Sequence, residues 1–327
     1  MFRARKRRIV FLFGLAIAAY ILVTVLFQID STAMENETLS VELPIYISRA
    51  RKHCEIDSTA VFPAKKNENL ILEPPYHINR TGRHCEVSFE WGEMCPKLYT
   101  ELGGRCDFID GTLQCPDIRN CSKFLNRQSQ LVITRMLRIF DLLAQKHGIK
   151  YWIAYGTLLG AARHHGFIPW DHDIDIEIPM EDYIKFFQNV SKELPGDIFF
   201  QNSISDPPLN PEDPTDFDKH EIVGFYERTW NPRLRDRNSC YKYCMVYDCE
   251  WHDGLMIDIF VLTNVSSSIY PLKRMNFEGF SFPVQNDWKT FLISYFGEDC
   301  FEFPMDGNQE PQENPDVHNG CEKLTQN

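Results

Sequence analysis

Acidic residues occupy every second position in one short segment of the chain. The segment Trp170–Ile178 reads WDHDIDIEI, and its acids are Asp171, Asp173, Asp175 and Glu177. Side chains alternate between the two faces of a β-strand, so we expect the acids on one face and isoleucines on the other. Closely spaced carboxylates repel one another unless a cation neutralises them. The pattern therefore predicts a site for Mg²⁺ or Mn²⁺, both of which prefer oxygen ligands.

A further acid, Asp258, interrupts the apolar run Leu255–Leu262 (LMIDIFVL). A lone carboxylate inside such a strand is costly to bury. The cost falls if a neighbouring strand brings Asp258 to the metal that Asp173 and Asp175 bind. We therefore predict that these three acids share one metal site.

Other interpretations of the acids compete with this one. A solvated edge strand with a charged outer face leaves Asp258 unexplained. An EF-hand calcium loop requires glycine and glutamate where this chain has Ile176 and Asp182. A glycosyltransferase that binds a sugar nucleotide through Mn²⁺ and an Asp-x-Asp motif uses the same metal chemistry, so the acids alone leave that alternative open.

The elements that must position these acids follow from periodicity. A stripe of apolar residues predicts a helix over 129–147, with Gly148 as its C-terminal cap. The β-branched and aromatic run 149–155 predicts a buried strand that ends at the turn Gly156–Thr157. Further along the chain we expect a short helix over 158–163, a helix over 180–190, a surface loop over 203–219, and strands over 222–230 and 255–262.

The N-terminal residues suggest a membrane anchor. Residues 9–27 form an apolar stretch without charges, long enough to cross a hydrocarbon core of about 30 Å, and the basic tail 1–8 precedes it. We therefore expect a single-pass type II membrane protein, with a cleaved signal peptide as the alternative. Residues 28–80 are polar and interrupted by prolines, which is typical of a stem.

The eleven cysteines all follow the apolar stretch, as expected in an oxidising compartment. Their density predicts a small disulfide-tied module over 81–128, without revealing its pairing. Cys240, Cys244, Cys249 and His252 are candidates for either disulfides or a structural Zn²⁺ site.

The rest of the chain adds two expectations. Residues 305–327 have little apolar content, so we expect a disordered tail. A net charge of −12 argues against binding to nucleic acid. The oligomeric state is left open.

Three segments resemble the LicD family. The stretch 155–176 (YGTLLGAARHHGFIPWDHDIDI) is similar to the family's main signature, Met256–Phe260 to its second acidic strand, and 288–299 (WKTFLISYFGED) to its closing segment. The resemblance covers about residues 130–304, and within it we take 129–304 as the catalytic domain. It implies an α/β (α+β) fold with a nucleotidyltransferase-like mixed sheet flanked by helices.

The resemblance also implies an activity. Members of the family use a CDP-linked donor and transfer a phospho-alditol or phosphocholine group to a glycan of a glycoprotein or glycolipid. Carried over residue by residue, the metal-binding acids are Asp173, Asp175 and Asp258, and Asp171 joins them as a catalytic residue. The matching donor-binding residues are Gly156, Thr157 and Arg163.

Topology and resemblance together suggest a Golgi membrane enzyme with a luminal catalytic domain. Two other classes are carried as alternatives. One is the nucleotide-sugar glycosyltransferase, and the other is a catalytically inactive scaffold that binds a glycan. The identity of the transferred group and of the acceptor glycan is not readable from the residues.

Overall fold

The computed structural model describes residues 85, 88–89, 92–205, 232–241, 251–302 and 315–324, which all lie in one compact unit, Ser48–Asn327. The expected fold class needs one correction. No helix in these ranges is long and apolar enough to cross a membrane, so the fold of the described residues contains no transmembrane helix. The expected span 9–27, its basic tail and the stem lie outside the described residues, as does the strand expected over 222–230.

A five-stranded mixed sheet forms the centre of this unit. Its strand order is β5-β6-β10-β8-β7, with β6 and β10 parallel and the other neighbours antiparallel. The mixed sheet flanked by helices is the architecture that the resemblance implied. The strands are β5 (Trp152–Ile153), β6 (Ile174–Pro179), β7 (Ile198–Gln201), β8 (Arg233–Asp236) and β10 (Met256–Leu262).

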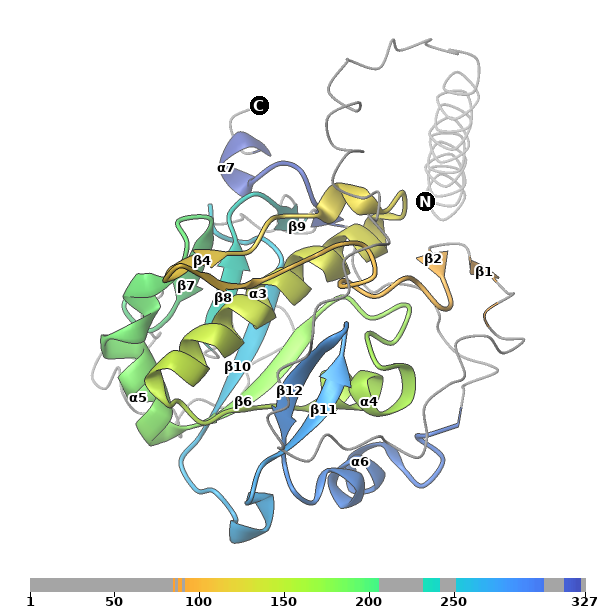
Figure 1. The fold of residues 1–327 in the computed structure, drawn as a ribbon, viewed down its shortest axis with the longest axis vertical. Helices are drawn as coiled ribbons and strands as arrows, with labels where there is room; N and C mark the ends of the chain where they lie inside the picture. Colours follow the sequence, from red (N-terminus) through yellow and green to blue (C-terminus); the bar gives the residue numbers. More distant parts are fainter. Residues whose placement is uncertain are drawn as a thin grey trace, which may run out of the picture. The chain divides into compact units, whose positions relative to one another are not determined.

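Two helices pack against this sheet. Helix α3 (Leu125–His147) lies across β8 and β10, and α5 (Met180–Gln188) contacts β6 and β10 (Figure 1). The isoleucines at 174, 176 and 178 are fully buried in the same core as the apolar stripe of α3. Helix α3 starts before the predicted residue 129, and it ends at Gly148, as predicted. Gly148 has a φ of 63° and donates its N–H to the carbonyls of Ala144 and Gln145.

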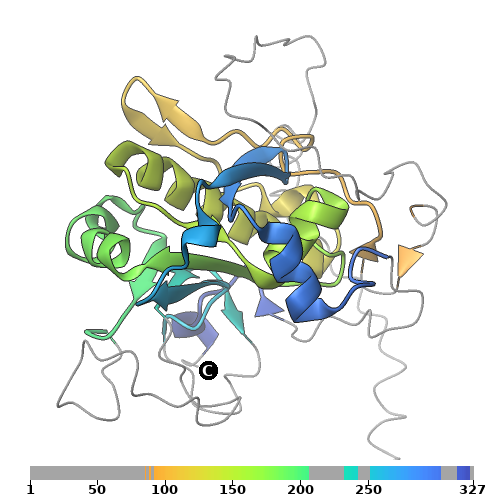
Figure 2. The same cartoon turned by 90° about the horizontal axis from the view of Figure 1, so that it is seen from below.

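The other side of the domain is built from α4, a hairpin and α6. Helix α4 (Tyr155–His164) contacts β6, the hairpin strand β11 (Lys273–Phe277) and α6 (Trp288–Phe296) (Figure 2). Strand β12 (Phe280–Val284) completes the hairpin through the two-residue turn Glu278–Gly279, in which both φ angles are positive. The remaining short elements in this half of the chain are η4 (Val190–Glu193) and η6 (Ser267–Ile269).

The cysteine-rich segment is stapled by disulfides, as predicted. The pairs are Cys85–Cys95 and Cys106–Cys115. The segment is not a separate domain, however, because Cys106 belongs to the main hydrophobic core. Its described elements are β1 (Ser88–Phe89), β2 (Gly92–Glu93), β3 (Asp107–Ile109), β4 (Thr112–Gln114) and η3 (Arg119–Cys121).

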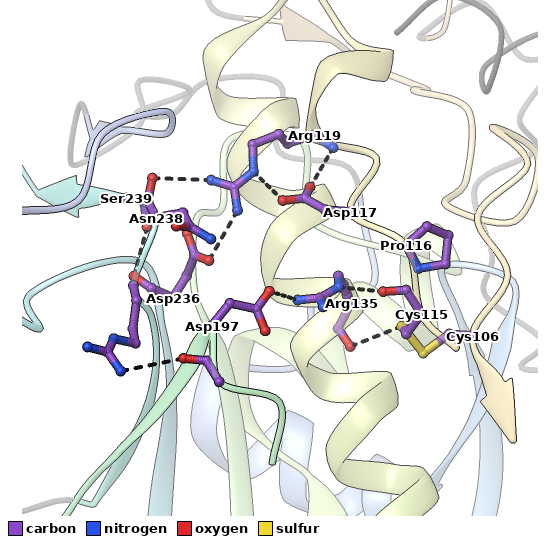
Figure 3. Close-up of polar contacts among 12 residues, drawn as sticks. Cys106, Cys115, Pro116, Asp117, Arg119, Arg135, Asp197, Asp236, Asn238 and Ser239 are labelled. Atoms are coloured by element: carbon purple, nitrogen blue, oxygen red, sulfur yellow. Dashed lines mark hydrogen bonds and ion pairs between the residues drawn. A yellow bond between two sulfur atoms is a disulfide. The ribbon is translucent and has the colours of Figure 1, made fainter. Parts of the chain in front are cut away.

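Buried arginines tie this segment to the sheet (Figure 3). Arg119 pairs with Asp117 at 2.6 Å and with Asp236 of β8 at 3.1 Å. Arg135 of α3 donates to the carbonyl of Cys115 and pairs with Asp197 at 2.8 Å. We refer to Arg119, Asp117 and Asp236 below as the Arg119 cluster.

The C-terminal segment corrects an expectation. Residues 315–324, which we expected to be disordered, contain β13 (Pro315–Asp316) and α7 (Cys321–Leu324). Strand β13 pairs with β9 (Cys240–Tyr241), and Val317 is fully buried. A disulfide joins Cys240 to Cys321. This long-range bond holds the segment in place, although the segment has little apolar content of its own.

Candidate active site

The register of the central sheet aligns two of the predicted acids. Asp175 of β6 lies opposite Asp258 of β10, and Asp258 lies opposite Arg233 of β8. The three side chains therefore form one row across three strands. Arg233 Nε forms an ion pair with Asp258 Oδ1.

Asp173 completes the group. Carboxylate oxygens of Asp173, Asp175 and Asp258 lie within 4.8 Å of one another, close enough to hold one metal ion. Two carboxylates from adjacent strands and one from the loop before β6 make an all-oxygen donor set, which suits a hard divalent cation. The structure therefore brings together the three acids that the sequence predicted as metal ligands.

The loop before β6 carries the other acid. Asp171 and Asp173 precede the strand, which begins at Ile174 rather than at Trp170, because the N–H of Asp171 bonds to the carbonyl of Ile168 and forms a turn. Asp171, His172 and Asp173 also place ligand atoms within 4.8 Å of one another. The loop thus adds a second set of potential ligand atoms that shares Asp173 with the first.

The electrostatics of the acids reflect their crowding. Burial raises the pKa of Asp171 well above its ordinary value, and the neighbouring Asp173 raises it further. Burial also raises the pKa of Asp175, with Asp173, Asp258 and Glu177 adding to the effect and Arg233 opposing it. The carboxylates are therefore costly to ionise without an added cation.

Glu177 has a different environment from the other acids. Its carboxylate accepts hydrogen bonds from Trp152 Nε1 at 2.5 Å and from the Tyr155 hydroxyl at 3.1 Å. Both oxygens are engaged by neighbours in the core. The alternation in the sequence placed Glu177 on the same face as the other acids, but its partners give it a structural role.

The predicted donor-binding residues line the loop that carries the acids. A Cβ atom on Gly156 would lie 3.1 Å from Asp171 Oδ2, so glycine is what lets the start of α4 approach this carboxylate. Thr157 is buried, and its hydroxyl accepts the N–H of Asp175 at 2.9 Å. Thr157 therefore holds β6 in place. Whether Gly156 and Thr157 also contact a donor stays a prediction.

Arg163 lies at the other end of α4. It is buried and donates through one guanidinium nitrogen to the carbonyls of Cys300, at 2.9 Å, and Glu302, at 3.1 Å. Its charge acts on Asp171 without a hydrogen bond between the two. In this structure Arg163 fastens residues 300–302 to the helix. Its predicted contact with a donor stays a prediction.

Two residues that sequence reasoning missed support the acidic loop. Asn126 Nδ2 of α3 donates to the carbonyl of Pro169 at 2.9 Å, and Gln130 Nε2 donates to the carbonyl of Asp171 at 2.8 Å. Both amides are buried. A sequence feature could have indicated this role. Asn126 and Gln130 are polar residues four positions apart, and polar side chains on the core side of a helix need buried hydrogen-bond partners.

Of the two alternatives for Cys240, disulfide or zinc ligand, the structure shows the disulfide. Cys240 is bonded to Cys321, and a sulfur in a disulfide cannot bind zinc as a thiolate. His252 is buried, stacks on Phe199 with ring centroids 5.0 Å apart, and lies 3.3 Å from Asp253. Cys244 and Cys249 lie outside the described residues.

Comparison with known proteins identifies the domain that carries the acids. Residues 148–287 match the family model described as LicD/FKTN/FKRP, nucleotidyltransferase domain. A stretch of 64 residues is 44% identical to the lipopolysaccharide cholinephosphotransferase LicD of Haemophilus influenzae, covering 20% of this chain and 24% of that protein. A stretch of 35 residues is 57% identical to ribitol 5-phosphate transferase FKRP of Homo sapiens, covering 11% of this chain and 7% of that protein.

These matches are local, since the chain spans about a quarter or less of the length of these relatives. Both relatives are named as transferases of a phosphate-linked group, which bears out the prediction of a transferase. The match includes Asp175 and Asp258 on the paired strands β6 and β10, and Asp173 in the loop before β6. Residues 148–287 of this chain therefore form a LicD-family nucleotidyltransferase domain.

Proposed function

We propose that the chain is a metal-dependent phosphotransferase that moves a phospho-alditol or phosphocholine group from a CDP-linked donor to a glycan of a glycoprotein or glycolipid. The observation that carries this proposal is the convergence of three acids within a LicD-family domain. Asp175 and Asp258 lie on adjacent strands, and Asp173 lies in the loop directly before β6. A glycan-binding scaffold has no use for such mutually repelling carboxylates.

The residues suggest how the reaction proceeds. A Mg²⁺ or Mn²⁺ ion bound by Asp173, Asp175 and Asp258 would neutralise charge on the donor diphosphate. Thr157 fixes the main chain at Asp175, while Asn126 and Gln130 hold the carbonyls on either side of Trp170. These contacts keep the carboxylates in place while a hydroxyl of the acceptor attacks the distal phosphorus of the donor in line. The new P–O bond forms as the diphosphate P–O bond breaks, so that CMP leaves.

Asp171 is the best candidate to receive the proton of the attacking hydroxyl. The Asp258 carboxylate is already engaged in an ion pair with Arg233, whereas burial and Asp173 raise the pKa of Asp171. A carboxylate with a raised pKa is a stronger base at neutral pH. We therefore assign the base role to the Asp171 carboxylate.

The disulfides support a location. Cys85–Cys95, Cys106–Cys115 and Cys240–Cys321 require an oxidising compartment to form and persist. On this basis we propose that the protein acts in the secretory pathway, with the Golgi as the first compartment to test by microscopy of the expressed protein.

Thermal unfolding of the protein tests the function without knowledge of the acceptor. CDP-ribitol, CDP-glycerol, CDP-choline and a set of UDP-sugars are each added with Mn²⁺ or with EDTA. A ligand at 100 times its dissociation constant stabilises the folded state by about 2.7 kcal/mol. We expect a CDP-linked donor to raise the unfolding midpoint only with Mn²⁺, and the responding donor names the transferred group.

Matched variants sharpen this experiment. Asp175→Asn should lose the donor-dependent shift, whereas Asp110→Asn, in the exposed turn between β3 and β4, should keep it. A shift with UDP-sugars instead would replace the proposal with a glycosyltransferase. No shift with any nucleotide would favour the inactive scaffold.

A further inference from the structure

Aromatic side chains collect beside the acids. The ring of Tyr155, at the start of α4, packs against Phe260 of β10 and against Phe291 and Tyr295 of α6. The ring centroids lie 5.1, 5.6 and 5.0 Å from that of Tyr155. Phe296 adds a further ring, 4.8 Å from that of Tyr295. We call these five residues the aromatic shelf.

The sheet register places the shelf close to the metal-binding acids. Phe260 lies opposite Glu177, two positions beyond the pair Asp258 and Asp175 on the same strands. Residues two apart share a face of the sheet and lie about 7 Å apart along it. The Tyr155 hydroxyl bonds to Glu177 and so fastens the shelf to that face.

The outer part of the shelf is exposed to solvent. Tyr295 is 61% exposed and Phe296 is 38% exposed. The other large hydrophobic residues that are exposed in the described part of the chain are isoleucines on separate elements, Ile109, Ile184 and Ile204. Two adjacent exposed aromatic rings next to a charged site are the kind of apolar patch that marks a binding surface.

The geometry of Tyr295 favours a flat ligand. Its ring lies nearly parallel to that of Phe291, with an interplanar angle of 16° and a centroid distance of 6.0 Å. One face of Tyr295 is therefore backed by a ring, and its exposure leaves apolar surface available for a further ring. Tyr155 holds its position with a φ of 44°, a backbone conformation that non-glycine residues seldom adopt.

We propose that the aromatic shelf is the subsite for the base of the nucleotide-linked donor, with Tyr295 stacking on the base. This inference rests on the proposed function, because it assumes that the donor diphosphate lies at Asp173, Asp175 and Asp258. In a nucleoside diphosphate the ribose separates the base from the phosphates, so with the diphosphate at the acids the base lies to one side of them. The shelf begins on that face of the sheet at Phe260, and Tyr155 connects Phe260 to Tyr295. An uncharged base also suits a neighbourhood that is already acidic.

Stacking predicts how the subsite behaves. Aromatic stacking on a base is tolerant of base identity, because every base offers a flat π face. The shelf therefore strengthens binding of CDP and UDP alike. Selection between the two bases must come from hydrogen bonds elsewhere in the site.

Isothermal titration of the full chain tests the inference. CDP, UDP and inorganic pyrophosphate are each titrated with Mn²⁺ into the unaltered protein, Tyr295→Ala, Tyr295→Phe and the control Ile109→Ala. We expect Tyr295→Ala to weaken CDP and UDP by about tenfold and to leave pyrophosphate unchanged. Tyr295→Phe and Ile109→Ala should bind all three ligands as the unaltered protein does.

The outcomes separate this inference from the proposed function. Two results would overturn the base subsite. One is equal affinity of the unaltered protein for CDP and pyrophosphate, and the other is an equal loss of affinity for both ligands in Tyr295→Ala. Either result is still consistent with diphosphate binding at the metal site. An unchanged CDP affinity together with a raised KM for the glycan acceptor in Tyr295→Ala overturns it in favour of a sugar-binding surface. Failure of the unaltered protein to bind either ligand with Mn²⁺ overturns the proposed function itself, and the subsite with it.

Discussion

Two groups of carboxylates at the same sheet differ in how their charge is balanced. In the Arg119 cluster, Asp236 is 1% exposed, and burial raises its pKa while Arg119 lowers it. The Asp236 and Asp117 carboxylates in turn raise the pKa of Arg119 against the effect of its burial. Each charge in this cluster has a partner of opposite sign within the chain (Figure 3).

The candidate active site lacks this balance. Asp175 is surrounded by three carboxylates that raise its pKa, and Arg233 is the cation that opposes them. In the Arg119 cluster, the chain places an arginine beside a buried acid that has only a structural role. The charge imbalance at Asp173, Asp175 and Asp258 is therefore a property of the site, and it creates the demand for a metal ion.

The largest effect should come from removing one carboxylate of the active site. Asp175→Asn keeps the shape of the side chain but removes a metal ligand, so we expect a loss of about a thousandfold in the rate of headgroup transfer. Product formation from the donor identified by thermal unfolding measures the rate. Asp110→Asn is the control, and near-normal turnover by Asp175→Asn would show that the acids are not metal ligands.

The matching change in the Arg119 cluster should affect stability instead. Asp236→Asn leaves the buried Arg119 guanidinium without its carboxylate partner on β8, and breaking a buried pair costs about 3–5 kcal/mol. Chemical denaturation measures the free energy of unfolding. Transfer activity per folded molecule should stay the same, and a selective loss of activity would remove the distinction between the two groups.

Removal of the disulfide at the C-terminal segment should lower the stability of the fold somewhat less than Asp236→Asn does. Arg119 also donates to the carbonyl of Val317, and the bond between Cys240 and Cys321 holds that segment against β9. We expect the double variant Cys240→Ser and Cys321→Ser to lose about 2–4 kcal/mol of stability. If its free energy of unfolding equals that of the unaltered protein, the Arg119 cluster does not depend on this segment.

The smallest predicted effect is a gain in stability, whereas the two preceding variants lose stability. In EDTA, Asp175→Asn should be more stable than the unaltered protein by about 1 kcal/mol at pH 7.5, because it removes a repelling charge. The raised pKa of Asp175 and Asp171 means that the folded state binds more protons than the unfolded state above pH 4. Stability contributed by these acids is therefore lost as pH rises through their folded pKa values.

Denaturation at several pH values checks this sign. The stability advantage of Asp175→Asn should grow from pH 5.5 to pH 7.5 in EDTA and should reverse when Mn²⁺ is added. An advantage that is independent of pH would mean that the variant acts through packing instead of charge.

The sequence predicted the parts of the site that are local. The helix cap at Gly148 and the acid in Met256–Leu262 follow from spacing over a few residues, whereas the strand expected from Trp170 begins only at Ile174. The cost of burying Asp258 predicted that it shares a metal site with Asp173 and Asp175, and the resemblance matched the same two acidic strands. Their adjacency is a long-range property of the sheet.

The remaining features depend on contacts that no local pattern contains. The order of residues 315–324 comes from a disulfide to β9 and the burial of Val317. Thr157 holds the main chain of β6, although its position in a glycine-hydroxyl turn suggested a phosphate contact. Cys240, a candidate for either a disulfide or a zinc site, has a sulfur partner in the C-terminal segment that no spacing in the sequence indicated.

The hydrogen bonds from Asn126 and Gln130 to the loop before β6 affect where the boundary of the domain should be drawn. The family match begins at residue 148, but the amides that support the loop before β6 come from α3, which ends at His147. A recombinant fragment cut at the matched boundary would keep every acid and lose the scaffold beneath them. A fragment designed to keep the candidate site intact should therefore start upstream of residue 148, where the family match begins.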